Sequence, residues 1–146
     1  MKTPIKFKKL NSNHFNEMLT LVKQLNPNKD IAILKQRLEH MLKSEAYQCF
    51  GVFKGATLIG LLGCWTFTKL YSGKQLELDN VIIDEKFQSK GYGKLFIDFI
   101  ENWAKNNDYE ALGLNTYVEN ARSHKFYFNQ GFKILGFNFQ KTLTVN

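Results

Sequence analysis

The 146-residue chain is long enough to bury a hydrophobic core, since 44% of its residues are hydrophobic and 14% are aromatic. Its 20 basic and 13 acidic residues give a formal net charge of +7, which favours an anionic partner such as nucleic acid, an anionic membrane surface or a phosphate-bearing ligand. No uninterrupted apolar segment reaches the roughly 20 residues that a membrane-spanning helix needs. We therefore expect a single domain over residues 1–146 with no membrane partner.

The first 42 residues predict one strand and two helices. Alternation over Ile5–Lys9 is typical of a strand. A helix is expected next, ending at Asn26–Asn28, and Asp30 is a good N-cap for a second helix. The apolar positions of the first helix are Phe15, Met18, Leu19, Val22 and Leu25. Those of the second are Ile31, Leu34, Leu38, Met41 and Leu42.

A hairpin and a further strand follow. The apolar runs Tyr47–Phe53 and Leu58–Phe67 flank the turn sequence KGAT, which predicts an antiparallel hairpin. A second turn at Tyr71–Lys74 leads to a strand over Leu76–Ile83. The two cysteines of the chain, Cys49 and Cys64, fall inside these apolar runs without the spacing of a zinc site or a disulfide-rich secreted fold.

The second half of the chain alternates helices and strands. A helix is expected after Gly91 and fades at Asn106–Asn107, and a strand is expected over Ala111–Val118. A short helix over residues 121–130 then ends at Gly131, and residues 133–145 are expected to form a final strand. The order β-α-α-β-β-β-α-β-α-β predicts an α/β fold with a central mixed, largely antiparallel sheet and helices on both faces.

No group of His, Cys and acidic residues has the spacing of a metal site, so we expect no metal. The N-terminal residues MKTPIKFKKL are basic but lack the apolar region of a signal peptide. Together with the two cysteines, this pattern predicts a reduced, cytoplasmic protein.

The sequence QSKGYGK, from Gln88 to Lys94, does not match the two common nucleotide-binding motifs. Phe96 stands where a dinucleotide-binding motif has its third glycine, and Leu95 stands where a P-loop has Ser or Thr. A glycine-containing turn at a helix N-terminus is nevertheless suited to an anion, because the helix dipole and unpaired N–H groups favour negative charge. Lys90 and Lys94 would add cations. The alternative is an ordinary turn with solvated lysines.

Two motifs resemble the GCN5-related N-acetyltransferase superfamily. QSKGYG, following LELDNVIIDEKF, resembles its acetyl-CoA-binding motif Q/R-x-x-G-x-G/A, with Glu85 and Ser89 where the family often has Pro and Gly. NARSHKFYFNQGF resembles its second signature. The matching positions there are Asn120, Ser123, Tyr127, Gly131 and Phe132, with Ser123 in place of the common alanine.

The resemblance implies a binding site for acetyl-CoA. The loop from Gln88 to Lys94 would hold the pyrophosphate, and the strand Leu76–Ile83 would separate from the next strand so that the pantetheine arm pairs with exposed backbone. The N–H of Ile83 would then donate to the thioester carbonyl. The implied coenzyme contacts are Val81, Ile82, Ile83, Gln88, Ser89, Lys90, Gly91, Tyr92, Gly93, Lys94, Asn120, Ser123 and Tyr127.

The resemblance also implies catalytic roles. Tyr127 stands where the superfamily places a general acid, with an aromatic core position as the alternative, and for Asn120 the alternative to a coenzyme contact is a plain helix N-cap. Glu77 stands where several members have a base, and Asp79 is a weaker candidate for that role. Strand alternation predicts that Glu77, Asp79, Val81 and Ile83 share one face, so that the two carboxylates line the acceptor site.

The expected function is therefore transfer of an acetyl group from acetyl-CoA to a primary amine of a small molecule or peptide, by direct attack in a ternary complex. A homodimer is possible, as in similar proteins. One alternative is a non-catalytic acyl-CoA sensor. Another is a basic nucleic-acid-binding module, which we do not favour because the lysines are dispersed and most aromatics occupy core-periodic positions.

Overall fold

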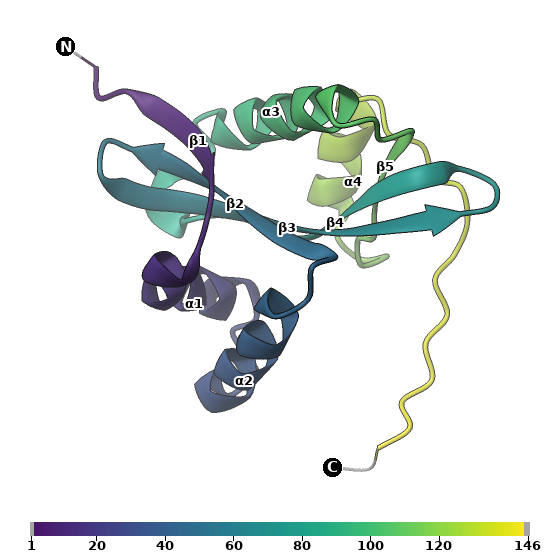
Figure 1. Ribbon diagram of the computed structural model, residues 1–146, viewed down its shortest axis with the longest axis horizontal. Helices are drawn as coiled ribbons and strands as arrows, with labels where there is room; N and C mark the ends of the chain where they lie inside the picture. Colours follow the sequence, from purple (N-terminus) through teal and green to yellow (C-terminus); the bar gives the residue numbers. More distant parts are fainter. Residues whose placement is uncertain (1, 145–146) are drawn as a thin grey trace. The chain divides into compact units, whose positions relative to one another are not determined.

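The computed structural model describes residues 2–144, which divide into two compact units, up to residue 114 and from residue 115. The first unit contains a five-stranded sheet with the strands in chain order (Figure 1). Its strands are β1 (Ile5–Lys9), β2 (Tyr47–Lys54), β3 (Thr57–Lys69), β4 (Gly73–Ile83) and β5 (Ala111–Leu114). All neighbouring pairs are antiparallel except β4 and β5, which are parallel. The predicted mixed, largely antiparallel sheet is confirmed.

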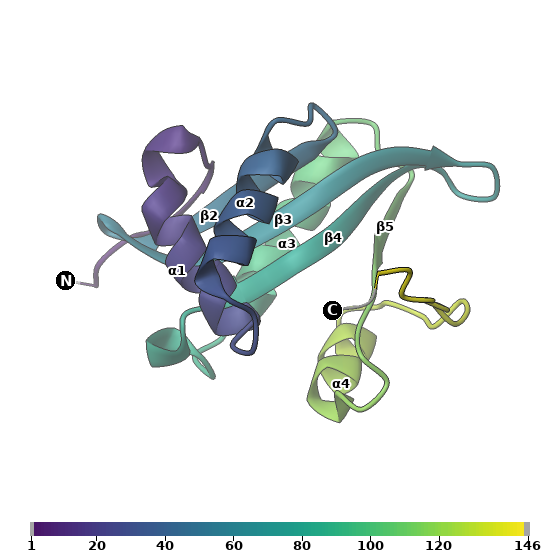
Figure 2. The ribbon, with the colours of Figure 1, turned by 90° about the horizontal axis from the view of Figure 1, so that it is seen from below.

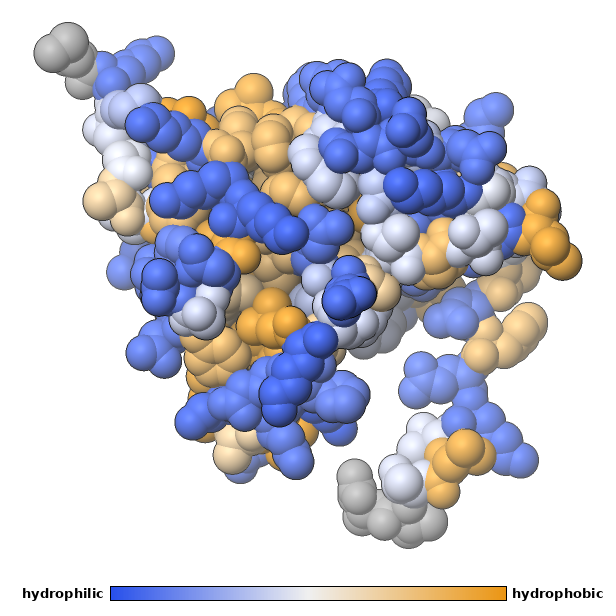
Figure 3. Space-filling view, in the orientation of Figure 1, coloured by the Kyte–Doolittle hydropathy of each residue, from blue (hydrophilic) through white to orange (hydrophobic). Residues whose placement is uncertain are grey.

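Helices cover both faces of this sheet, as the sequence predicts. Helices α1 (Phe15–Leu25) and α2 (Ile31–Leu42) pack on one face, and α3 (Tyr92–Asn106) packs on the other (Figures 1 and 2). Asp30 caps α2 by accepting a 2.7 Å hydrogen bond from the N–H of Ala32. Short 3₁₀ turns at Ser12–His14 and Glu85–Phe87 lead into α1 and toward α3. In the view of Figure 3, hydrophilic side chains predominate over α2 and α3.

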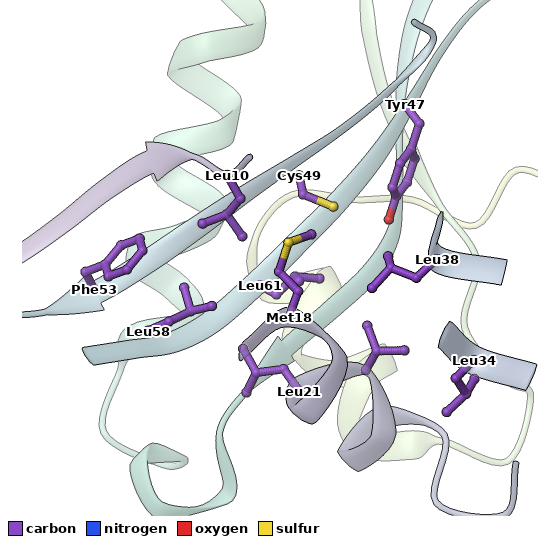
Figure 4. Close-up of a cluster of buried hydrophobic side chains, with 11 residues drawn as sticks. Leu10, Met18, Leu21, Leu34, Leu38, Tyr47, Cys49, Phe53, Leu58 and Leu61 are labelled. Carbon is purple, nitrogen blue, oxygen red and sulfur yellow. The ribbon is translucent and has the colours of Figure 1, made fainter. Parts of the chain in front are cut away.

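The face toward α1 and α2 carries a buried cluster drawn from both helices and the central strands (Figure 4). Met18, Leu61 and Cys49 are almost completely inaccessible to solvent. Burial raises the pKa of the Cys49 thiol to about 11 and that of the buried Cys64 thiol to about 12, so both remain protonated at neutral pH. These cysteines are free, core residues, as the sequence predicts.

The opposite face is packed with aromatic rings. Phe50 on β2 meets Phe99 and Trp103 of α3 at ring-centroid distances of 5.7 and 4.9 Å. Phe96 and Ile100 of α3 are fully buried beside them. This apolar stripe explains why α3 docks on the sheet, because burial of aromatic surface is the largest favourable contribution at such contacts.

The second unit is built around α4 (Ala121–Asn129). The Asn120 side chain caps the helix by accepting a hydrogen bond from the N–H of Ser123 at 3.1 Å. Gly131 has a φ of 89° and follows the last turn, in agreement with its predicted role as a C-terminal cap. No helix within residues 2–144 is long and apolar enough to cross a membrane.

Two strand predictions are corrected. The strand expected over Ala111–Val118 ends at Leu114, and the final strand expected over residues 133–145 is not formed by its described residues, 133–144. In that segment Leu135, Phe137 and Phe139 alternate with small or polar residues but are exposed. Alternation is a local property, whereas a strand exists only when its backbone pairs with a neighbour.

Replacing Leu61 by alanine should lower the free energy of unfolding by about 2–5 kcal/mol, because its side chain is fully buried and a cavity would remain. Urea unfolding followed by circular dichroism measures this change. Leu70→Ala is the matched control, since Leu70 lies fully exposed in the β3–β4 turn and its loss should cost less than about 0.5 kcal/mol. Equal losses for the two variants would contradict the assignment of Leu61 to the core.

Candidate functional site

Strand β4 is paired on only part of one edge. Its parallel ladder with β5 joins Gln75–Leu78 to Ala111–Leu114 and stops there, whereas β4 itself continues to Ile83. On its other edge, β4 stays paired with β3 up to Ile83. From Asp79 to Ile83, therefore, the edge of β4 toward β5 has no strand partner among the described residues. Unpaired backbone of this kind is able to pair with an extended ligand.

A β-bulge lies where the open edge begins. Gly63 on β3 is opposite Asn80, and the next residue, Cys64, is opposite Leu78, so Asp79 is an extra residue without a partner across the ladder. The phenol of Tyr47 packs so closely over Gly63 that a Cβ there would overlap with the hydroxyl oxygen. Glycine is therefore required at position 63.

The bulge overturns the prediction that Glu77, Asp79, Val81 and Ile83 share a face. Residues directly opposite each other in an antiparallel pair point to the same side of the sheet. Glu77 is opposite Trp65, which packs against the α1/α2 cluster. Val81 is opposite Leu62, which is opposite Phe50 on the α3 side. The alternation fails because the extra residue shifts it by one position.

The two carboxylates nevertheless lie near each other, on the side facing α1 and α2. The indole N–H of Trp65 donates to Asp79 Oδ2 at 2.9 Å, which holds the exposed Asp79 on the same side as Trp65 and Glu77. Asn80 Nδ2 donates to Tyr47 Oη at 3.0 Å. Burial raises the pKa of the Tyr47 phenol, so that it stays protonated. The sequence analysis did not single out Trp65, because its contact with Asp79 depends on the bulge.

The loop after β4 has the backbone geometry of an anion site. Gln88 Nε2 donates to the carbonyl of Ile83 at 2.8 Å and so connects the loop to the end of the open edge. Gly91 adopts a left-handed conformation with φ of 86°, and a Cβ there would meet no atom within 4 Å. The N-cap residue of α3 is Gly91, which has no side chain that could cap the helix, so the N–H groups of its first turn, at the positive end of the helix dipole, are suited to a bound anion. This loop fits the phosphate-binding role that the resemblance implies.

The structure adds a third lysine to the two cations expected near the loop. Lys94 forms an ion pair with Asp98 at 2.8 Å, which partly satisfies its charge. Lys90 lies over the ring of Phe87 at 5.7 Å, and Lys54 from the end of β2 lies at the same distance from that ring. Lys54 was missed by the sequence analysis because it is far from the motif in the chain. Folding of the β2–β3 hairpin brings it close.

The remaining predicted site residues belong to the second unit, and the contacts given for them are contacts within that unit. Tyr127 packs edge-on against Phe126 and Phe132 at 5.1 and 5.5 Å, and burial raises the pKa of its phenol above the ordinary value. Asn120 is an N-cap, which was the simpler of its two predicted roles. His124, which the sequence analysis did not assign to the site, has its ring Nε2 2.8 Å from the carbonyl of Tyr117.

Comparisons with known proteins identify the family. The model of the acetyltransferase (GNAT) family matches residues 15–132. The chain belongs to this family. The Bacillus subtilis (strain 168) protein named uncharacterized N-acetyltransferase YhdJ is 27% identical over 126 residues, covering 86% of this chain and 89% of that protein. The chain is therefore a homologue of GNAT N-acetyltransferases, as the two motifs predict.

Solved structures agree on the GNAT fold. The aminoglycoside N-acetyltransferase AAC(6')-Iy, in complex with CoA, superposes with a TM-score of 0.84 at 18% identity, covering 99% of this chain and 98% of that one. A GNAT family acetyltransferase of Staphylococcus aureus superposes with a TM-score of 0.78 at 23% identity, covering 98% and 100%. At these identities the likeness establishes the fold.

Gly91→Ala should weaken coenzyme A binding by about tenfold or more, because the loop needs a left-handed residue and close backbone approach there. Gly55→Ala is the control, since Gly55 also has a positive φ, of 60°, but lies in the β2–β3 turn. Both variants should lose about 1 kcal/mol of stability from the left-handed conformation. Calorimetric titration with coenzyme A measures the affinities, and unchanged affinity in Gly91→Ala would remove the loop from the site.

Proposed function

We propose that this protein transfers an acetyl group from acetyl-CoA to a primary amine of a small molecule or peptide, by direct attack in a ternary complex. The observation that carries the proposal is the open edge of β4 from Asp79 to Ile83, which leads directly into the loop before α3 in a GNAT chain. The neighbouring AAC(6')-Iy structure was solved with CoA.

In this proposal the donor acetyl-CoA is held by backbone groups of the first unit. The pyrophosphate binds the loop from Gln88 to Lys94, with Lys90 beside it, and the pantetheine arm lies along Val81, Ile82 and Ile83. The remaining contacts assigned to the loop are Ser89, Gly91, Tyr92 and Gly93. Asn120 and Ser123 are assigned to the coenzyme by their match to the second signature. The N–H of Ile83 donates to the thioester carbonyl oxygen, a contribution of roughly 3 kcal/mol in comparable sites.

Proton transfers are assigned to two side chains. The acceptor ammonium, with a pKa near ~10.4, must lose a proton before its nitrogen bonds to the carbonyl carbon, and Glu77 accepts that proton directly or through water. As the carbon–sulfur bond breaks, Tyr127 donates a proton to the departing thiolate. A raised pKa for the Tyr127 phenol supports this role, because a general acid must be protonated at the working pH.

The acceptor is proposed to be cationic, because Glu77 and Asp79 are carboxylates with no basic partner among the described residues. AAC(6')-Iy is named as an aminoglycoside acetyltransferase, which is consistent with a small polar amine as acceptor. The possible homodimer stays a prediction.

Saturating acetyl-CoA should stabilise the protein by about 2.7 kcal/mol at a concentration of 100 Kd, which a thermal shift assay detects as a higher Tm. A panel of primary amines, assayed by release of free coenzyme A, then identifies the acceptor class. Absence of any stabilisation would refute the proposal at its first step. Stabilisation without coenzyme A release for any amine would favour the acyl-CoA sensor.

Tyr127→Phe should lower kcat by about 10²-fold or more while leaving the acetyl-CoA thermal shift intact, since only the donated proton is lost. Tyr117→Phe is the control, because Tyr117 is 78% exposed and has no assigned role. In the wild-type enzyme, kcat should fall at alkaline pH only above the ordinary phenol pKa of about 10, because burial raises the pKa of Tyr127. An unchanged kcat in Tyr127→Phe would exclude the residue as the acid.

A further inference from the structure

The only polar group of the Trp65 side chain, its indole N–H, forms a hydrogen bond with an exposed carboxylate. Its indole N–H donates to Asp79 Oδ2 at 2.9 Å, and Asp79 is the extra residue of the bulge. Asn80 Nδ2 makes a longer contact, 3.4 Å, with the same oxygen. Within residues 2–144 no hydrogen bond reaches Oδ1 of Asp79. One oxygen is therefore fixed by the protein, and the other faces solvent.

The indole itself is held firmly. Its ring packs against Tyr47 with centroids 4.7 Å apart, and Trp65 borders the buried cluster under α1 and α2. Tyr47 is buried, is hydrogen-bonded by Asn80 and has close packing over Gly63. Because the indole is already held in place, it orients the Asp79 carboxylate before a ligand arrives, so little side-chain conformational entropy is lost when the ligand binds.

Charge around this pair favours a cation. The chain carries a formal charge of +7, and the ion pairs Lys94–Asp98 and Lys105–Glu101 on α3 involve neither Glu77 nor Asp79. Glu77 is directly opposite Trp65 in the ladder and Asp79 accepts from its indole, so both carboxylates are neighbours of Trp65. An aromatic ring beside carboxylates attracts ammonium groups through its face as well as through charge.

The two carboxylates cannot serve the same amine equally well. A carboxylate held against the reacting ammonium stabilises the protonated form and so opposes the deprotonation that attack requires. Glu77 is the proposed base. A carboxylate fixed by a hydrogen bond, with no assigned proton transfer, is better suited to a charge on the acceptor that does not react.

We propose that Trp65 is a positioning residue that holds Asp79 to bind a second, non-reacting ammonium of the acceptor, so that the enzyme prefers di- or polyamines over monoamines. The inference rests on the proposed acetyl transfer to an amine. Glu77 and Asp79 are two residues apart on β4, which corresponds to at most about 6–7 Å along the strand, because the bulge shortens the advance there. The acceptor class is therefore an amine with a second cationic group at about that separation.

The test compares kcat/KM for n-butylamine and 1,4-diaminobutane in five proteins: wild type, Trp65→Phe, Asp79→Asn, the double variant of these two, and Trp103→Phe. Wild type should prefer the diamine. Trp65→Phe keeps a ring but loses the N–H, and should raise KM for the diamine about tenfold with kcat within about twofold. Its KM for the monoamine should not change. Asp79→Asn should lose the preference completely, and the double variant should show no further loss.

Trp103→Phe is the matched control, because Trp103 lies on α3 and packs on Phe50 and Tyr109 away from the bulge. It should behave as wild type. The inference is overturned if wild type shows no preference for the diamine, if Trp65→Phe affects both amines equally, or if Trp103→Phe has the same effect. A merely structural role for Trp65 would lower kcat and stability for both acceptors without separating them.

A binding readout separates this inference from the proposed reaction. In Trp103→Phe, Trp65 is the only tryptophan, so its fluorescence reports directly on the site. Titration with 1,4-diaminobutane should give a saturable change that n-butylamine does not, and Asp79→Asn in this background should abolish it. If binding is seen but no amine is acetylated, the proposed function fails while the cation site stands. If amines are acetylated but the diamine gives no signal, the inference fails alone.

Discussion

The contact between the Tyr47 phenol and Gly63 determines the geometry of the part of the candidate site that lies on β4. The phenol fills the space that a side chain at position 63 would need, and its oxygen accepts a hydrogen bond from Asn80. Between them, these contacts hold the bulge that makes Asp79 an extra residue. A bulge re-aims side chains and ends regular pairing, and here it does both within one strand.

The bulge divides β4 into a part that carries Glu77 and pairs with β5 and a part whose edge toward β5 is open. Before it, Glu77 faces the α1/α2 side and β4 is paired with β5. After it, the edge toward β5 is open and the strand runs to Ile83, where Gln88 joins the loop to the strand end. An open strand edge is normally a risk for aggregation, so a short edge that pairs with a ligand is a reasonable use of it.

In the first unit, basic residues lie where the anionic coenzyme is proposed to bind, and acidic residues lie where the cationic amine is proposed to bind. Lys54 and Lys90 gather around Phe87 beside the loop, where a pyrophosphate would carry negative charge. Glu77 and Asp79 lie near the bulge, where an amine would carry positive charge. Although the net charge is +7, the region near the bulge is locally acidic. Net charge alone therefore could not have distinguished an amine acceptor from a nucleic-acid partner.

By itself, the sequence determined the helices, the first four strands and the family, because helical periodicity, caps such as Asp30 and Gly131, and two motifs at fixed spacing are local signals. Only the tertiary structure decided which way Glu77 and Val81 point, since a bulge shifts alternation and is visible only against the partner strand. It likewise brought Lys54 to Phe87 and Trp65 to Asp79, and left residues 133–144 outside any strand. In each case the deciding factor is pairing between distant parts of the chain, which no local pattern encodes.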